Sequence, residues 1–262
     1  DSAPFFGVTI ACLDDEGVQR ILGRIRRRVT TYGLSRQADV RADDVRHDGA
    51  VTTFEVVSQG ERMGRIAFPS PGLHNLRNAL AAVAVGLELD MRFDDIAGAL
   101  EGFSGVDRRF QVKGEASGVI VVDDYAHHPT EVEATLDAAQ TAFAGRRVVA
   151  VFQPHLYSRT HDLMDAFSRA FFDADVLILT TIYGARETQE QYPDVSGATL
   201  AEQARANGHR GVVYVSAMDN LEATLDRVVR PGDVVVTMGA GPIYKWGNAL
   251  LERLQAKSGE DA

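Results

Sequence analysis

The second half of the chain alternates short apolar runs with longer stretches of helical periodicity. The apolar runs are rich in Val and Ile and lie at 119–122, 147–152, 176–180, 212–215 and 234–237. Helical spacing follows each of them, at 129–144, 158–171, 198–206, 220–228 and 243–255. Because a continuous apolar run indicates burial on both faces of a sheet, this half is predicted to be an α/β domain with a doubly wound parallel (Rossmann-like) sheet.

The first half shows a different pattern. An apolar run at 5–13 predicts a buried strand, and 16–25 has the spacing of a helix. We interpret the basic cluster Arg26 to Arg28 as the solvated end of that helix. Short alternating runs separated by turn residues predict a small antiparallel sheet, at 38–45, 51–58 and 63–68.

Two further helices, 73–89 and 93–100, close the first half. Gly102 and Gly105 then flank a short linker, which is typical of a domain boundary. We therefore expect two domains, with bounds 1–105 and 106–262.

Composition narrows the class of protein. With 262 residues, 45% hydrophobic and 24% charged, the chain is typical of a globular protein. Its formal charge of −10 argues against nucleic acid or acidic membranes as partners. The single Cys12 excludes an intramolecular disulfide and suits a reducing cytosol, so we expect a cytoplasmic protein. The chain has no Met at position 1, and we expect it to be part of a longer protein.

Polar side chains are concentrated where the first strand of the second domain ends. The stretch from Asp123 to Glu131, DDYAHHPTE, follows this strand and leads into a helix that begins at Pro129. Ligands of open α/β sheets bind at this edge, and a helix N-terminus offers free amides to an anion. The alternative is a polar loop with a favourable helix start.

The next strand is followed by a similar loop. Residues 152–160, FQPHLYSRT, place Gln, His, Ser, Arg and Thr before the next helix. In a parallel sheet the two loops lie on the same carboxyl edge. Together they predict a site for an anionic substrate.

Two other segments carry candidate binding groups. His74, Asn75 and Asn78 are spaced to share one face of the helix at 73–89, where amides could read a purine edge. Capping and a buried amide network are the alternative. The pair Arg108 and Arg109 at the domain boundary could hold a phosphate, or could form an ordinary surface ion pair.

Other motifs argue against some chemistries. His127 and His128 have no third or fourth ligand at metal-site spacing, so no metal ligand is assigned. The Gly239 to Gly241 turn is a weak dinucleotide motif, because the chain ends one helix later. No Gly-x-x-x-x-Gly-Lys-Ser/Thr loop for nucleotide phosphates is present.

These motifs, in this order, resemble the Mur ligase family. The matching stretches cover nearly the whole chain: GLHNLRNAL at 72–80, RRF at 108–110 with Gly114 and Glu115, DDYAHHPTE at 123–131, FQPHLYSRT at 152–160, and MGAG at 238–241. The third and fourth favour the branch that joins L-alanine to UDP-N-acetylmuramate through an acyl phosphate, in peptidoglycan synthesis. Pro242 departs from the family pattern, which usually has Asp there.

The resemblance implies a three-domain ATP- and Mg²⁺-dependent enzyme. Residues 1–105 would be the C-terminal part of its central ATP-binding domain, without the P-loop, and 106–262 its Rossmann-like C-terminal domain. We therefore expect the chain alone to be inactive, with most Mg²⁺ ligands outside it.

The resemblance also implies roles for individual residues. Those implied for the nucleotide are His74, Asn75, Asn78, Arg109 and Asp124, with Asp124 holding the ribose hydroxyls. Those implied for the substrates are Tyr125, His127, His155 and Arg159, with His127 and Arg159 in catalysis.

Three other hypotheses remain open. The first is the related ligase that recycles a tripeptide onto the sugar nucleotide, and the second is a non-catalytic nucleotide-binding or docking module. The third, an oxidoreductase, rests on Gly239 to Gly241 alone.

Overall fold

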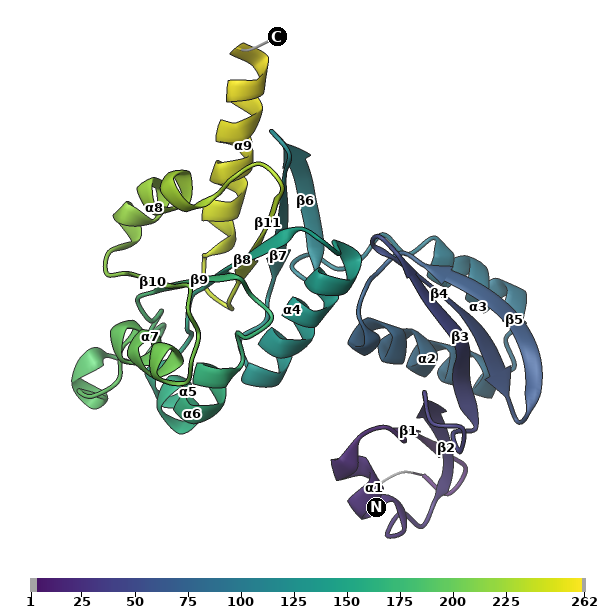
Figure 1. The fold of residues 1–262 in the computed structure, drawn as a ribbon. Helices are drawn as coiled ribbons and strands as arrows, with labels where there is room; N and C mark the ends of the chain where they lie inside the picture. Colours follow the sequence, from purple (N-terminus) through teal and green to yellow (C-terminus); the bar gives the residue numbers. More distant parts are fainter. Residues whose placement is uncertain (1–3, 261–262) are drawn as a thin grey trace. The chain divides into compact units, whose positions relative to one another are not determined.

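The chain forms two compact units, Asp1–Gly105 and Val106–Ala262. This division comes from a computed structural model that describes residues 4–260, with side chains to residue 257. Each unit has its own sheet (Figure 1) and its own hydrophobic core. The α/β fold class predicted from the sequence is confirmed.

Unit 1 contains a five-stranded mixed sheet in the order β1-β2-β3-β4-β5. Its strands are β1 (Val8–Cys12), β2 (Arg28–Gly33), β3 (Val40–Asp48), β4 (Val51–Ser58) and β5 (Glu61–Phe68). The first three are parallel neighbours, and β3, β4 and β5 form the predicted antiparallel part. The interpretation of Arg26 to Arg28 as a helix end was wrong. Arg28 begins β2, where β-branched and aromatic residues favour a strand, and it pairs with Glu88.

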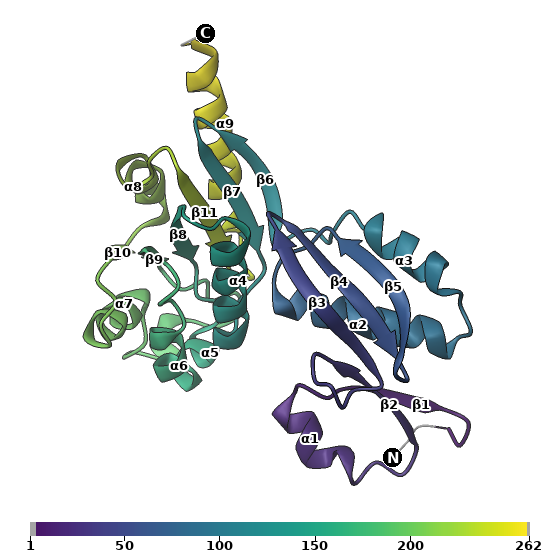
Figure 2. The same ribbon diagram turned by 45° about the vertical axis from the view of Figure 1, so that its right-hand side comes forward.

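Two helices of unit 1, α2 (Leu73–Glu88) and α3 (Phe93–Glu101), pack against this sheet. Helix α1 (Glu16–Leu22) connects β1 to β2 and has no buried residue. Leu76, Leu80 and Val83 of α2 are fully buried with Phe54 and Ile66 of the sheet. Figure 2 shows α2 and α3 alongside β3, β4 and β5. Helix α2 follows β5 directly, so its first turn, with the His and Asn side chains, lies just after the end of that strand.

Unit 2 contains a six-stranded sheet in the order β10-β9-β8-β11-β7-β6. Its strands are β6 (Gln111–Ala116), β7 (Val119–Asp124), β8 (Arg147–Phe152), β9 (Val176–Thr180), β10 (Val212–Val215) and β11 (Asp233–Met238). Five are parallel, as predicted, but β6 pairs antiparallel with β7 at the edge. The sequence pattern missed β6 because an edge strand with Gln, Lys and Glu has no continuous apolar run.

Helices cover both faces of the second sheet. They are α4 (Pro129–Ala142), α5 (Tyr157–Asp162), α6 (Met164–Arg169), α7 (Gly197–Ala206), α8 (Leu221–Val228) and α9 (Tyr244–Glu260), with short 3₁₀ turns at Gln189–Gln191 and Met218–Asn220. One core layer contains Leu136, Phe167 and Leu200, and the opposite layer contains Leu225 and Leu250. The doubly wound arrangement is thus confirmed.

The single helix predicted at 158–171 is in fact two. The backbone leaves the helical region at Leu163, with φ −114° and ψ 17°. Leu163 and Met164 pack against the core at this break, so burial of apolar side chains is favoured over helix continuity.

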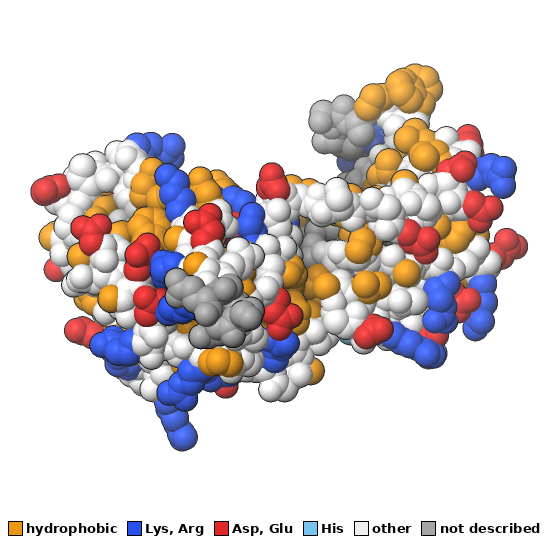
Figure 3. Space-filling view, turned by 90° about the horizontal axis from the view of Figure 1, so that it is seen from above, with side chains coloured by type: hydrophobic (Ala, Val, Ile, Leu, Met, Phe, Trp, Pro, Cys, Tyr) orange, Lys and Arg blue, Asp and Glu red, His pale blue; other side chains and the backbone are white. Residues whose placement is uncertain are grey.

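Charged side chains of both signs are interspersed with apolar ones on the face seen in Figure 3. None of the helices within the described residues is long and apolar enough to cross a membrane.

Candidate functional site

The two polar loops lie on one edge of the unit 2 sheet. Met238, the last residue of β11, is in register with Asp124 of β7 on one side and Phe152 of β8 on the other. The loops after β7 and β8 therefore emerge together, and the rings of His127 and His155 lie 6.4 Å apart. Alignment of parallel strands thus produces the candidate site.

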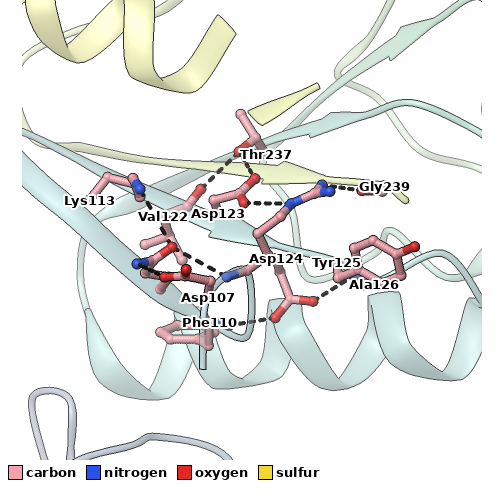
Figure 4. Close-up of polar contacts among 12 residues, drawn as sticks. Asp107, Phe110, Lys113, Val122, Asp123, Asp124, Tyr125, Ala126, Thr237 and Gly239 are labelled. Carbon is pink, nitrogen blue, oxygen red and sulfur yellow. Dashed lines mark hydrogen bonds and ion pairs between the residues drawn. The ribbon is translucent and has the colours of Figure 1, made fainter. Parts of the chain in front are cut away.

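Asp123 is the centre of a buried polar network (Figure 4). Its side chain is 2% exposed, and it accepts hydrogen bonds from Arg108 Nε at 3.0 Å and Thr237 Oγ1 at 2.7 Å. Arg108 also donates to the carbonyl oxygen of Gly239. One carboxylate thus connects the start of unit 2 to β7 and β11.

Asp124 points to the opposite face of β7 and accepts backbone hydrogen bonds. Its two oxygens accept from the amides of Phe110 and Ala126, each at 2.7 Å (Figure 4). Burial raises the pKa of Asp124 to about 6, although these two hydrogen bonds favour the ionised form. With the residue only 4% exposed, a ribose contact would need the remaining lone pairs of these oxygens, and it stays a prediction.

The start of α4 already holds an anion, the carboxylate of Glu131. The amides of His127 and His128 donate to Glu131 Oε2 at 2.9 and 3.1 Å. Burial opposes ionisation of Glu131, but these bonds and nearby positive charge outweigh it, so the pKa of Glu131 lies below its usual value. Glu131 thus occupies the amides of His127 and His128, the two residues that precede Pro129, so neither amide is open to an anionic ligand.

The two histidines have opposite tautomers when neutral. His127 Nδ1 lies 2.9 Å from the carbonyl oxygen of Tyr125 and must donate to it, so Nε2 is its basic nitrogen. His155 Nδ1 lies 3.3 Å from Arg159 Nη1 and must accept, so its proton is on Nε2. Burial, then the charges of Arg159 and His127, lower the pKa of His155.

Tyr125, His127, His155 and Arg159 thus form one partly exposed group. The ring of Tyr125 lies edge-on to His127, at 5.2 Å between centroids. Arg159 also approaches the carbonyl oxygen of His155, at 3.4 Å. The structure brings together all four residues expected for the substrates, and such an array of imidazole and guanidinium groups suits a carboxylate.

Arg109 is exposed between two residues with left-handed backbones. Arg108 has φ 60° and Phe110 has φ 44°, values that side chains other than Gly rarely adopt. The Arg109 guanidinium lies 3.9 Å from Glu131 and 6.0 Å from the ring of Tyr125. It therefore lies beside the start of α4, as a cation directed at the site.

The remaining nucleotide candidates belong to unit 1. His74 and Asn75 are half-buried and Asn78 is exposed, all on the first turns of α2. Asn75 Nδ2 donates to the carbonyl oxygen of Pro71 at 2.8 Å, so one amide hydrogen serves the helix start. Adenine binding by these three residues stays a prediction.

Some residues of the site were not expected from the sequence. Tyr183, after β9, stacks on His155 at 5.7 Å between centroids. Glu187 accepts from the amide and hydroxyl of Ser158 at 2.9 and 2.6 Å and so supports the loop after β8. Both residues could have been predicted from the sequence, because they follow a third parallel strand whose carboxyl end lies on the same edge of the sheet.

Two expectations about motifs can be compared with the geometry. Gly239 has φ 144°, and a Cβ at this position would lie 2.6 Å from the carbonyl oxygen of Gln153. Its role in close packing of the β8 and β11 ends is thereby explained. Among the described residues, no group of three or more His, Cys, Asp or Glu is arranged to hold a metal ion.

Comparison with known proteins shows the family. Residues 2–86 match the Mur ligase middle domain, and residues 108–241 match the glutamate ligase domain of Mur ligases. The chain therefore belongs to the Mur ligase family.

Its relatives include UDP-N-acetylmuramate–L-alanine ligases. That of Salinibacter ruber is 54% identical over 259 residues, which cover 99% of this chain and 54% of the relative. That of Geobacter sp. strain M21 is 51% identical over 97% of this chain and 54% of its own length. The chain thus spans about half the length of the curated relatives it matches.

Solved structures have the same fold. The UDP-N-acetylmuramate-alanine ligase of Thermotoga maritima superposes with a TM-score of 0.74 at 26% identity, over 87% of this chain and 48% of that one. A murein peptide ligase from Psychrobacter arcticus has a TM-score of 0.69 at 23% identity, over 96% and 52%. The second likeness concerns the fold alone.

Proposed function

We propose that this chain is part of an ATP-dependent ligase that joins L-alanine to the carboxylate of UDP-N-acetylmuramate, a step of peptidoglycan synthesis in the cytoplasm. The observation that carries the proposal is the meeting of the β7 and β8 loops, whose imidazole and guanidinium groups suit a carboxylate. The names of relatives 44–54% identical over nearly the whole chain support it.

In this proposal residues 1–105 are the C-terminal part of the central ATP-binding domain and 106–262 are the C-terminal domain. ATP supplies the phosphoryl group that converts the muramoyl carboxylate into an acyl phosphate, and Mg²⁺ neutralises the phosphate charge. His74, Asn75, Asn78, Arg109 and Asp124 serve the nucleotide. Because the described residues offer no acidic cluster for a metal, the Mg²⁺ ligands are assigned to other parts of the protein.

The β8 loop and His127 serve the substrates. Arg159 pairs with a substrate carboxylate, and Tyr125 and His155 form the walls around it. The basic Nε2 of His127 accepts a proton from the incoming ammonium group, because only the free amine can attack the activated carbonyl. This gives His127 and Arg159 the catalytic roles.

The test is ATP-dependent phosphate release by the full-length protein that contains this chain. Release is expected only when UDP-N-acetylmuramate and L-alanine are both present. The matched variants His127→Gln and Arg159→Gln should each lower the rate at least about hundredfold, since positioned charge and proton-transfer groups contribute factors of this size. Turnover that proceeds equally well with the recycled tripeptide in place of L-alanine would instead favour the tripeptide ligase.

A non-catalytic nucleotide-binding or docking module is the second candidate. The 262-residue chain alone is expected to bind ATP weakly and not to hydrolyse it. Alanine-dependent phosphate release by this chain alone would contradict that expectation. Full-length protein that binds ATP but shows no turnover with any muramoyl substrate would favour the module.

A further inference from the structure

Arg108 has no binding or catalytic role so far, yet its side chain makes several contacts at the carboxyl edge of the unit 2 sheet. Its guanidinium pairs with Asp123 at 3.0 Å and donates to the carbonyl oxygen of Gly239. The same group lies 4.9 Å from the ring centre of Tyr125 and 4.8 Å from that of Tyr244. Arg108 is thus held by β7, β11 and the start of α9, within one compact unit.

The backbone of Arg108 is also held by hydrogen bonds at this edge of the sheet. The Arg108 carbonyl oxygen accepts from the amide of Tyr125 at 2.7 Å, and its own amide donates to Gln111 Oε1 at 3.2 Å. Two residues further on, the Phe110 amide donates to Asp124, and the Phe110 ring is buried. The residues on either side of Arg109 are therefore both fixed.

Fixing both neighbours determines where Arg109 points. Arg108 and Phe110 both have positive φ. Such a backbone conformation costs of order 1–3 kcal/mol per residue and persists only where surrounding contacts impose it. Side chains of successive residues point in different directions. Because the Arg108 side chain packs into the edge of the sheet, that of Arg109 is left exposed beside Glu131. Of the pair, Arg109 is the arginine whose side chain is exposed.

We propose that Arg108 is a positioning residue, which acts in the proposed reaction only through Arg109 and Tyr125. The inference rests on the proposed function for its kinetic consequence, but its structural part is independent of it. A guanidinium is required because a planar fork can meet a carboxylate and a carbonyl while it stacks between two rings. A lysine ammonium can keep the ion pair but not the other contacts.

The kinetic test is a double-mutant cycle on the full-length enzyme, with Arg108→Lys, Arg109→Ala and the double variant. Arg108→Lys is expected to raise the KM for ATP about tenfold with a smaller effect on kcat, and to have little further effect when Arg109 is Ala, since residues that act as one unit are not additive. Equal effects of Arg108→Lys in both backgrounds would overturn the proposal, as would an unchanged KM. Arg169→Ala, an exposed residue of α6, is the control.

The structural test uses amide hydrogen exchange on the 262-residue chain. In Arg108→Lys and Arg108→Ala, the amides of Phe110 and Tyr125 are expected to exchange at least about tenfold faster, while the interior amides of β8 keep their rates. Unchanged exchange at both amides would overturn the positioning role, whatever the enzyme assay shows. If exchange rises but the full-length wild type lacks alanine-dependent turnover, the proposed function fails and the structural role of Arg108 stands.

Discussion

The loops after β7 and β8 leave the same edge of the sheet, but they use their polar side chains differently. The carboxylates of the stretch that ends β7 and leads into α4 all accept hydrogen bonds from within the protein. Asp123 accepts from Arg108, and Asp124 and Glu131 each accept from two backbone amides. The β8 loop presents His155 and Arg159, which contact mainly one another and stay partly exposed. The first loop thus uses its carboxylates to stabilise the fold, and the second presents an imidazole and a guanidinium group to a ligand.

This comparison separates stability from activity. Substitutions of the three carboxylates of this first stretch should lower the free energy of unfolding, whereas substitutions of His155 and Arg159 should lower the rate of the proposed reaction. Four experiments test the division.

Asp123→Ala should cause the largest loss. It leaves the Arg108 guanidinium, 20% exposed, without its carboxylate, and a buried ion pair broken in this way costs about 3–5 kcal/mol. Urea unfolding of the 262-residue chain measures the loss. Thr237→Val is the control, because it removes only the hydroxyl that donates to Asp123 and to the Val122 carbonyl oxygen, at a cost of about 1 kcal/mol. Equal losses of unfolding free energy in the two variants would show that the ion pair between Asp123 and Arg108 stabilises the fold no more than the Thr237 hydroxyl does.

Asp124→Asn should change the pH dependence of stability. The pKa of Asp124 is raised from 3.8 to about 6 in the folded protein, so the native state binds the proton more tightly than the unfolded chain. The free energy of unfolding contributed by this group is therefore greatest below about pH 4 and falls as pH rises to about 6, by about 3 kcal/mol at 1.4 kcal/mol per pKa unit.

The wild-type chain also contains carboxylates with lowered pKa values, Asp14 and Glu131, which act in the opposite direction. The informative measurement is thus the difference between wild type and Asp124→Asn in urea unfolding at several pH values. That difference should change between pH 4 and 6 and level off above. A flat difference would mean that the two backbone hydrogen bonds offset the effect of burial on the pKa of Asp124.

Glu131→Ala should have an intermediate effect. Its loss leaves two amides at the start of α4 without their acceptor, which costs about 1–2 kcal/mol for a helix cap. Because the folded pKa of Glu131 is lowered, its contribution is present above the unfolded value near 4.5 and is lost as pH falls through the folded pKa. Glu133→Ala, exposed on the same helix, should change stability by less than about 0.5 kcal/mol.

His155→Ala and Arg159→Ala should have the smallest effects on stability, each below about 1 kcal/mol, because their contacts are few and partly solvated. In the full-length enzyme the same substitutions should lower alanine-dependent phosphate release at least about hundredfold. Unfolding and activity are measured on the same variants. A loss of unfolding free energy as large as that of Asp123→Ala would show that the β8 loop also stabilises the fold.

The sequence by itself determined the architecture and the location of the site. Continuous Val and Ile runs such as Val119 to Val122 require burial on both faces, and parallel strands bring their carboxyl ends to one edge. Both properties are local, so they could be predicted. Strand β6 escaped prediction because edge strands need no apolar run.

Only the tertiary structure decided which side chain of each adjacent pair serves the fold and which faces a ligand. Asp123 and Asp124 point to opposite faces of β7, and their partners are residues as distant in the chain as Thr237 and Phe110. Likewise, Arg108 turns inward because Gly239 and Tyr244 meet it there. The contacts with Thr237, Gly239 and Tyr244 join residues more than 100 positions apart, and no local pattern encodes them.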